Sequence, residues 1–246
     1  MIIDGKAVAK QVRNEVRIET ERLRDSHDIV PGLAVVLVGE DPASRLYVRN
    51  KEKACAEVGI RSVEHLLSAS VRQDELLDLI GQLNQDPAIH GILIQLPLPE
   101  HLVTHQILEA VSPDKDVDGF HPENIGLLAA GNPRFIPCTP KGILRILRFY
   151  NIETNGKHAI IVGRSNIVGR PIANMLSAKN DTGNATVTVC HSRTPDIANY
   201  TRQGDIVIAA VGIPSLIKGD MISDGTVIID VGINRVEDNS EKGYKL

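Results

Sequence analysis

The sequence predicts two α/β domains, each built around a parallel β-sheet. Apolar strand-like runs alternate with helix-like segments from end to end, as they do in a parallel sheet that helices cover on both faces. The 246 residues suffice for one large α/β domain or two smaller ones. One loop-rich passage, residues 112–140, interrupts the alternation before it restarts. We therefore predict one domain over residues 1–138 and a second over residues 139–246, with a connecting helix near 139–150.

Three strands are predicted in the first domain, at residues 33–39, 62–67 and 91–97. The first, LAVVLVG, is apolar throughout, which fits a strand buried on both faces. Helices are predicted between the strands, because the leucines and isoleucine of VRQDELLDLIGQLN recur at helical spacing. Thr139 is predicted to cap the connecting helix, KGILRILRFY, with Pro140 in its first turn.

The helix after the first strand carries the most informative side chains. Asp41 can cap it, and Gly59 can end it in a left-handed conformation. At about 100° per residue, Ser44, Tyr47 and Lys51 fall within roughly 60° of each other. A hydroxyl, a phenol and an amine then share one face near the carboxyl end of a buried strand, where open α/β sheets bind ligands. The alternative is a solvated face, on which tyrosine and lysine keep only their tips in water.

Four strands are predicted in the second domain, at residues 158–163, 186–192, 205–212 and 226–232. The first gives way to a helix through IIVGRSNIVGRP, whose Gly163 and Gly169 form the pattern G-x-S-x-x-x-G. One glycine permits a tight turn, and the other lets the helix pack closely with free N–H groups aimed at a phosphate. The context of strand, turn and helix predicts dinucleotide binding, with an ordinary glycine turn as the alternative.

The end of the next strand favours NADP over NAD. An NAD site usually has an acidic residue there to bind the ribose 2′-hydroxyl, but this strand ends CHSRT, without an acid. His191, Ser192 and Arg193, with Arg164 in the glycine turn, are donors suited to a 2′-phosphate. Each arginine alone also fits a solvated surface position.

Composition excludes several classes of function. The chain is 42% hydrophobic and 24% charged, with a formal net charge of -4, which gives no support to nucleic-acid or anionic-membrane binding. With 3% aromatic residues and no tryptophan, a stacking surface for single strands is not expected. No run is long enough for a membrane span, and the N-terminus lacks a signal-peptide pattern. Cys55, Cys138 and Cys190 predict reduced, mostly buried thiols without a metal site.

Several motifs, taken in order, resemble the bifunctional methylenetetrahydrofolate dehydrogenase/cyclohydrolase family. They are S-x-x-Y-x-x-x-K-x-K-A-C, GILIQLPLP, DKDVDGF, PCTPKGI and VGRSNIVGRP, and the resemblance extends to about Asn234. It implies a catalytic N-terminal domain with a parallel sheet, a Rossmann-like NADP-binding C-terminal domain, and an active site in the cleft between them. It also implies a cytoplasmic homodimer that acts on tetrahydrofolate derivatives in one-carbon metabolism and purine biosynthesis.

The resemblance assigns roles to four residues of the first domain. Tyr47 corresponds to the ring that stacks on the folate, and Lys51 to the catalytic amine. Gln95 corresponds to the residue that hydrogen-bonds that lysine, and Asp118 to the carboxylate that holds the amino edge of the pterin. Asp116 is the competing carboxylate, and only the motif selects Asp118.

Further binding residues follow from the same resemblance. Thr139 matches a position beside the nicotinamide, and Ser44 is expected to support the lysine or the pterin. The remaining expected substrate contacts are Leu96 and Pro97, and the expected cofactor contacts are Gly163, Arg164, Ser165, Val168, Gly169, His191, Ser192, Arg193, Val211, Gly212 and Ile233.

The implied chemistry comprises two steps. A hydride passes from 5,10-methylenetetrahydrofolate to NADP, and water then hydrolyses the 5,10-methenyl product to 10-formyltetrahydrofolate. The first step needs orientation, whereas the second needs proton transfer, for which a partly desolvated Lys51 is suited. Two alternatives stay open, a monofunctional dehydrogenase and a folate- or NADP-binding protein without turnover.

The C-terminal sequence departs from the family pattern. The family continues past the G-I-N segment with another strand, a P-G-G-V-G-P loop and a helix, whereas this sequence ends NSEKGYKL. We therefore expect either a C-terminally truncated form or a naturally short one.

Overall fold

The computed structural model describes residues 2–232, 236–237 and 244–245. The chain forms two compact units, residues 1–136 and 137–246, and each has its own parallel sheet.

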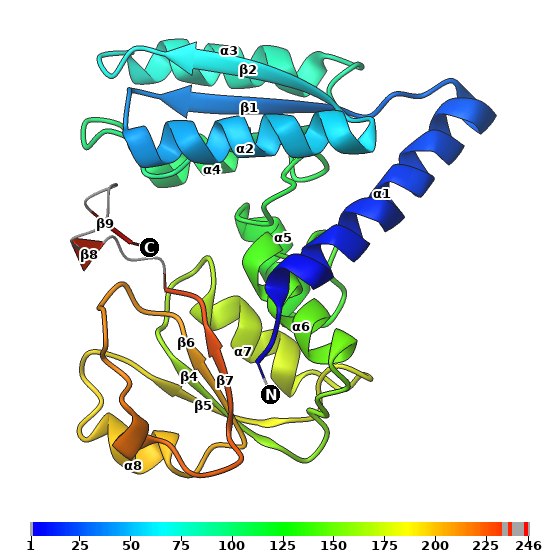
Figure 1. Cartoon of the computed structure of the whole chain (residues 1–246). Coiled ribbons are helices and arrows are strands. Elements are labelled where there is room, and N and C mark those ends of the chain that lie inside the picture. The colour runs from blue at the N-terminus through cyan, green and yellow to red at the C-terminus, as the bar shows by residue number, and fades with distance from the viewer. Residues whose placement is uncertain (1, 233–235, 238–243, 246) are drawn as a thin grey trace. The chain divides into compact units, whose positions relative to one another are not determined.

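The N-terminal unit contains three parallel strands in the order β2-β1-β3 (Figure 1). Strand β1 is central, so the chain crosses to one side of it for β2 and to the other side for β3. Its register runs from Gly32 beside Arg61 to Val38 beside Leu67. The elements are α1 (Gly5–His27), β1 (Gly32–Val38), α2 (Pro42–Val58), β2 (Arg61–Leu67), α3 (Gln73–Gln85), β3 (Gly91–Ile94), α4 (Thr104–Ala110) and α5 (Pro122–Ala129).

Helices cover this sheet on both faces, as predicted. Alternate residues of β1 point to opposite sides, and Val35 and Leu37 pack with Val48 of α2. On the other face, Val36 packs in a cluster that includes Leu76 of α3. Burial of both faces explains the continuous apolar run of β1.

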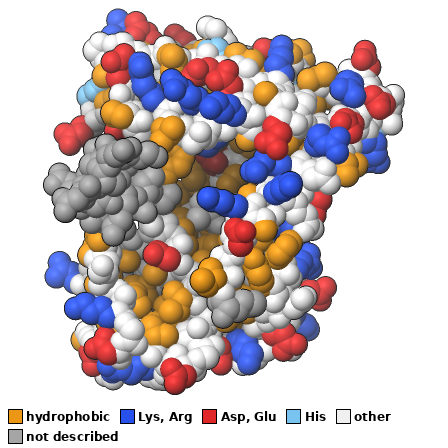
Figure 2. Space-filling model, in the orientation of Figure 1, with side chains coloured by type: hydrophobic (Ala, Val, Ile, Leu, Met, Phe, Trp, Pro, Cys, Tyr) orange, Lys and Arg blue, Asp and Glu red, His pale blue; other side chains and the backbone are white. Residues whose placement is uncertain are grey.

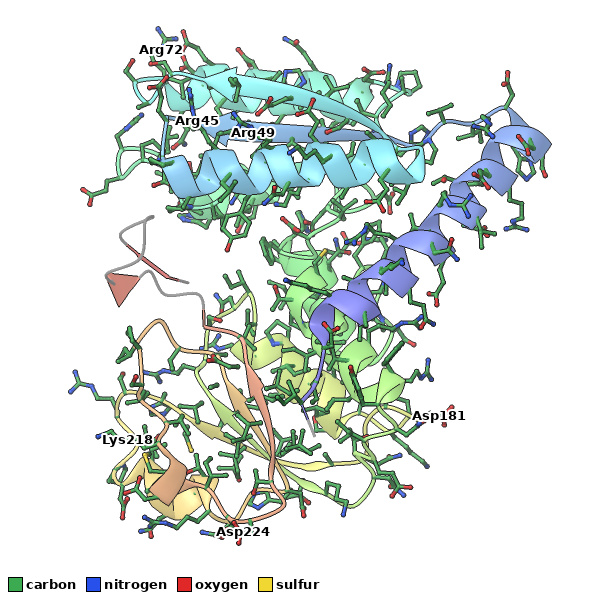
Figure 3. All side chains as sticks on the ribbon, viewed as in Figure 1. Arg45, Arg49, Arg72, Asp181, Lys218 and Asp224 are labelled. Carbon is green, nitrogen blue, oxygen red and sulfur yellow. The ribbon has the colours of Figure 1, made fainter. Side chains whose placement is uncertain are left out.

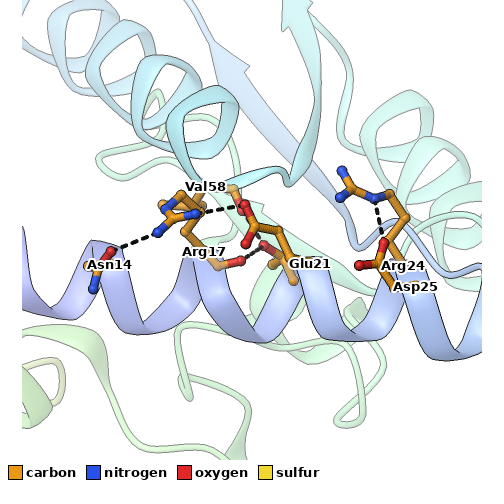
Figure 4. Close-up of polar contacts among 7 residues, drawn as sticks. Asn14, Arg17, Glu21, Arg24, Asp25 and Val58 are labelled. Carbon is orange, nitrogen blue, oxygen red and sulfur yellow. Dashed lines mark hydrogen bonds and ion pairs between the residues drawn. The ribbon is translucent and has the colours of Figure 1, made fainter.

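Helix α1 was not among the predicted elements. Asp4 caps it by accepting hydrogen bonds from the N–H groups of Lys6 and Ala7. Its buried Thr20 donates to the carbonyl of Val58 at the end of α2. Figure 4 shows the surrounding polar contacts, among them hydrogen bonds between exposed side chains of α1 that join Arg17 to Asn14 and Glu21, and Arg24 to Asp25. The helix is mostly polar, but Val8, Val12 and Val16 recur every four residues, so the sequence carried a helical signal that the prediction missed.

Helix α5 lies in the passage expected to be a loop. His121 caps it through Nδ1, which accepts from the N–H of Glu123, and Pro122 occupies the first turn. The passage 112–140, expected to be rich in loops, therefore also contains a helix that was not predicted. Only eight residues long, this helix is too short for a clear apolar period.

The C-terminal unit contains four parallel strands in the order β5-β4-β6-β7. Helix α7 packs on β4 and β5, and Ile197 of α8 packs with Ile160 and Val207 on the opposite face (Figure 1). The elements are α6 (Cys138–Phe149), β4 (His158–Val162), α7 (Gly169–Ser177), β5 (Thr186–Cys190), α8 (Ile197–Thr201), β6 (Ile206–Ala209), η1 (Gly219–Met221), β7 (Val227–Asp230), and the antiparallel pair β8 (Val236–Glu237) and β9 (Tyr244–Lys245).

Helix α6 begins one residue earlier than its predicted cap. Pro137, with an extended backbone, precedes the helix, and no side chain caps it. Thr139 therefore lies inside the first turn, and the prediction that it caps the helix is wrong. Pro140 does occupy that turn, where its missing N–H leaves no hydrogen bond unmade.

Candidate functional site

Helix α2 starts directly after β1, at the end of the sheet where the strand order reverses. Asp41 caps it by accepting from the N–H of Ser44 at 2.7 Å, and Gly59 ends it with a φ of 79°. Hydrogen bonds from the backbone and the hydroxyl of Ser44 hold the pKa of Asp41 below its ordinary value. Ser44 is 4% exposed. Its hydroxyl thus has a partner inside the helix cap.

Lys51 and Gln95 meet across two elements that are far apart in the sequence. The Nζ of Lys51 donates to Oε1 of Gln95 at 3.0 Å, in a partly buried contact. Gln95 follows β3, and its own Nε2 donates to the carbonyl of Leu96 at 2.8 Å. This second bond fixes the amide, so that its oxygen faces the lysine.

The other basic side chains of α2 contrast with Lys51. Arg45 and Arg49 are exposed, and Lys and Arg side chains gather over this helix (Figures 2 and 3). The guanidinium of Arg45 pairs with the exposed Glu40 at 2.8 Å. The alternative that Lys51 lies on a merely solvated face does not explain its partly buried contact with Gln95. Tyr47, 40% exposed, presents its ring to solvent and leaves it accessible to a ligand.

Two carboxylates of the DKDVDG segment have different surroundings. Asp116 is 5% exposed, and its Oδ2 accepts from the N–H of His121 and from Nδ2 of Asn124, both at 2.8 Å. Asp118, two residues on, is half-buried. The buried carboxylate is committed to the protein interior, which favours Asp118 as the one that meets a ligand.

The three cysteines, all among the described residues, form no disulfides. Cys55 and Cys190 are buried, and burial raises the pKa of each thiol. Cys138 is exposed, in the first turn of α6. No group of three or more His, Cys, Asp or Glu side chains suited to a metal ion occurs in the part of the chain that the structure describes.

The ends of three strands of the C-terminal unit converge on the glycine turn. The N–H of Gly163 donates to the carbonyl of Cys190 at the end of β5, and the N–H of Ala210 donates to Val162. Gly163 has a φ of 130°, which favours glycine, and a Cβ there would overlap the carbonyl oxygen of Ala210. A Cβ on Gly169 would overlap the backbone of Gly163. Both glycines are therefore required by close approach of the backbone.

Ser165 explains the departure from the usual glycine fingerprint. Its Oγ accepts from the N–H groups of Val168 and Gly169 at 3.1 and 3.3 Å, and its carbonyl accepts from the N–H of Arg170 at 3.0 Å. Pro171 has no N–H. The expectation that α7 itself directs free N–H groups at a phosphate is therefore wrong, because its first turn is already satisfied.

The glycine turn supplies donors in place of the helix. Among the described residues, no hydrogen bond engages the N–H groups of Arg164, Ser165, Asn166 and Ile167. Side chains in this turn are exposed. The cradle in which a Cβ finds no room and the run of free N–H groups fit the diphosphate of a dinucleotide.

The loop after β5 lies beside this turn because β4 and β5 are paired. The N–H of Arg193 donates to Nδ1 of His191 at 3.1 Å, and Thr194 closes the same loop through the N–H of His191 at 2.9 Å. Ser192 and Arg193 are exposed. The predicted donors His191, Ser192 and Arg193 therefore all follow the end of β5, and His191 also stabilises the loop.

The other expected cofactor residues that the structure describes are located by the element on which, or directly after which, each lies. Val211 and Gly212 follow β6, which pairs with β4. Thr139 is exposed in the first turn of α6, which packs on α7. Ile233 lies outside the described residues. Three contributors were not predicted, namely the Ala210 carbonyl, Thr194 and Asn124. Thr194 ends the CHSRT segment that the sequence had singled out, whereas no motif marked the other two.

Comparison with known proteins agrees with both units. The sequence profile of the tetrahydrofolate dehydrogenase/cyclohydrolase catalytic domain matches residues 3–118, and that of the NAD(P)-binding domain of the same family matches residues 137–244. The chain is 57% identical to the bifunctional protein FolD of Magnetococcus marinus, covering 96% of this chain and 82% of the relative. It is 58% identical to FolD of Moorella thermoacetica, with the same coverage.

Solved structures give the same result. The FolD methylenetetrahydrofolate dehydrogenase/cyclohydrolase of Campylobacter jejuni superposes with a TM-score of 0.92 and 47% identity, covering 99% of this chain and 83% of that one. FolD of Trypanosoma brucei, solved with NADP and an inhibitor, gives 0.93 and 39%, covering 100% and 84%. The chain belongs to the tetrahydrofolate dehydrogenase/cyclohydrolase family.

Proposed function

We propose that this chain is a bifunctional enzyme that oxidises 5,10-methylenetetrahydrofolate with NADP and hydrolyses the 5,10-methenyl product to 10-formyltetrahydrofolate. The observation that carries the proposal is the 3.0 Å contact between Lys51 Nζ and Gln95 Oε1 at the carboxyl ends of β1 and β3. Family membership and the intact glycine turn of the C-terminal unit support it.

Oxidation requires the folate to be held with its methylene carbon exposed to the hydride acceptor. NADP supplies that acceptor. The exposed ring of Tyr47 stacks on the folate, and Asp118 accepts paired hydrogen bonds from the amino edge of the pterin. Ser44, Leu96 and Pro97 complete this contact surface. A lone pair on the folate nitrogen stabilises the developing cation, so this step depends on orientation more than on a protein base.

Hydrolysis requires a group that moves a proton. Water adds to the cationic methenyl carbon, loses a proton, and the carbon–nitrogen bond to N5 breaks as that nitrogen is protonated, leaving the formyl group on N10. Lys51 transfers the proton, and Gln95 holds its amine in place through the oxygen that accepts from Nζ. Gln95 therefore acts on the reaction through the position of the lysine.

The C-terminal unit binds NADP in this proposal. Backbone donors of the turn after Gly163 meet the diphosphate, and Val168 and Gly169 line the same turn. Arg164 and Arg193 pair with the 2′-phosphate, since both are exposed and neither forms an ion pair with another of the described residues. The further contacts are proposed for Ser165, His191, Ser192, Val211, Gly212, Ile233 and, beside the nicotinamide, Thr139.

Further proposals concern the setting of the enzyme. We assign the folate to the domain of residues 1–138 and NADP to that of residues 139–246. We also propose a homodimer in the cytoplasm, from the family resemblance. Within the described residues, none of the helices combines the length and the apolar character that crossing a membrane requires.

Steady-state assays of the purified chain test the proposal. We expect NADP-dependent formation of the methenyl product from methylenetetrahydrofolate, and hydrolysis of added methenyltetrahydrofolate without cofactor. Dehydrogenase activity alone would favour the monofunctional alternative. Binding of both ligands without turnover of either would favour a non-catalytic binding protein.

A further inference from the structure

A polar cluster adjoins the loop that carries Asp118. It consists of the buried Asp116 and Asn124 and the exposed Arg134, which come from the loop, from α5 and from the segment after α5. Asp116 is 5% exposed and Asn124 is fully buried. Buried polar groups of this kind are costly unless they are satisfied, so the cluster calls for an explanation.

The loop is fixed at both ends. Before Asp118, the N–H of Ile92 in β3 donates to the carbonyl of Lys115 at 2.7 Å, and Ile92 and Asp116 form a parallel bridge. After Asp118, the carboxylate of Asp116 reaches forward to the N–H of His121 at 2.8 Å. The Asp116 side chain therefore closes the loop into a ring, with Asp118 inside it.

Asn124 locks the carboxylate that closes this ring. Its Nδ2 donates to Asp116 Oδ2 at 2.8 Å and to the carbonyl of Pro113 at 2.9 Å, which uses both of its hydrogens. Its Oδ1 accepts from Nη1 of Arg134 at 3.2 Å. The guanidinium also pairs with two exposed carboxylates, at 2.9 Å to Asp114 and 2.8 Å to Glu123. Every polar atom of the Asn124 side chain is thus satisfied.

The position of the bridge relates this cluster to the folate site. The bridge places Asp116 beside Ile92, three residues before Gln95, and the loop then turns through Asp118, because the N–H of Gly119 donates to the carbonyl of Asp116 at 3.2 Å. Close packing supports the same placement, because a Cβ on Gly91 would lie 2.5 Å from Cγ1 of Val117. The loop therefore has little freedom to shift along β3.

We infer that Asp116, Asn124 and Arg134 are positioning residues that hold the carboxylate of Asp118 in register for the pterin, an inference that rests on the proposed function. A carboxylate accepts two adjacent N–H donors only in a narrow geometry. Misplacement of a binding group by about 1 Å can cost about a hundredfold in rate. The two acids of the D-V-D motif thus have different roles: Asp116 anchors the loop, and Asp118 binds the ligand.

The test is a double-mutant cycle between positions 116 and 118. Asp116→Ala should raise the KM for methylenetetrahydrofolate about tenfold or more, as expected when a charge-assisted anchor is lost, while the KM for NADP stays within about twofold. In an Asp118→Ala background the same change should add less than about twofold, because Asp116 acts through Asp118. An equal rise in both backgrounds would overturn the inference.

Two further variants separate positioning from loss of stability. Asp116→Asn keeps an oxygen acceptor where Oδ2 stands and should recover most of the folate KM, whereas a loss as large as that of the alanine variant would overturn the inference. Thr20→Val is the matched control, because it removes another buried hydrogen bond of the same unit. It should lower the melting temperature without moving the folate KM, and a shift in that KM would also count against the inference. A wild-type chain that neither binds nor turns over methylenetetrahydrofolate would instead overturn the proposed function.

Discussion

The two units of this chain share one strand topology but place different chemical groups after their central strands. In each, the chain runs through a central strand, turns, enters a helix, and crosses to opposite sides for its next two strands, giving the orders β2-β1-β3 and β5-β4-β6. The crevice at such a reversal is where open α/β sheets bind ligands. The turn after β1 leads to side chains, Tyr47 and Lys51. The turn after β4 instead presents backbone N–H groups, in a bend where a side chain on Gly163 has no room.

The helix caps follow the same division. Asp41 caps α2 with a carboxylate, and this leaves the functional groups to residues further along the helix. Ser165 satisfies the first turn of α7, and this leaves the N–H groups of the preceding turn for a ligand. A site made of side chains should respond to deletion of one functional group, whereas a site made of backbone should respond to added bulk. The predictions below separate these two cases.

The largest effect is expected from deleting the amine of Lys51. Lys51→Met keeps the length of the side chain and removes the proton-transfer group, so methenyl hydrolysis should fall by about a hundredfold or more. Dehydrogenase activity should survive in part, because hydride transfer does not need a base. Separate initial-rate assays of the two reactions measure the difference.

Lys53→Met is the matched control for that variant. Lys53 is an exposed lysine on the same helix, and its substitution should change neither activity. Hydrolysis at a near wild-type rate in Lys51→Met would show that the contact with Gln95 serves structure alone.

The glycine turn proposed to bind NADP should be most sensitive to a larger side chain at Gly163. In Gly163→Ala the new Cβ overlaps the Ala210 carbonyl, and the φ of 130° strains any other residue. We expect a loss of about 1–3 kcal/mol in stability and a KM for NADP raised by about tenfold or more. Thermal melts with and without NADP, together with steady-state kinetics, measure both effects.

Gly142→Ala provides the control for Gly163→Ala. Gly142 lies in α6 and a Cβ there meets nothing within 4 Å, so alanine should leave NADP binding unchanged and stabilise the helix slightly. If Gly163→Ala binds NADP as wild type does, the turn is not the diphosphate site.

A smaller and more selective effect is expected from the arginines beside that turn. Replacing Arg164 and Arg193 together with serine should raise the KM for NADP about tenfold, because two cationic partners of the 2′-phosphate are lost. The KM for NAD should stay nearly unchanged, since NAD lacks that phosphate. Parallel titrations with the two cofactors measure the ratio, and equal losses for both would reject the assignment of these arginines.

The difference between the units also explains what sequence alone could predict. Side chains with fixed spacing, such as Tyr47 and Lys51, and the continuous apolar strands were predicted because their chemistry is local. The contact of Lys51 with Gln95 joins positions 44 residues apart, and only the family resemblance indicated it. The burial of Asp116 escaped prediction because it depends on tertiary partners that no local pattern specifies. The Ser165 cap of α7 and the polar helix α1 were missed although both rest on local features, namely a serine three and four residues before the N–H groups that it binds, and valines at helical spacing.

The smallest expected effect concerns the cap of α2. Hydrogen bonds from Ser44 lower the pKa of Asp41 in the folded protein. A carboxylate with a lowered folded pKa stabilises the fold above its unfolded pKa, about 3.9 for Asp, and this contribution is lost as the pH falls through the lower folded value. Asp41→Asn caps about as well and does not titrate in this range.

The melting temperature of Asp41→Asn relative to wild type should therefore depend on pH. Above about pH 5 the wild type should be equal or slightly more stable, and the difference should shrink as the solution is acidified, because only the wild-type cap is protonated. Melts of both proteins from neutral to acidic pH, at one salt concentration, measure this. A gap that stays constant or widens on acidification would show that the Asp41 charge does not stabilise α2, so that this helix is held, like α7, without help from a charged cap.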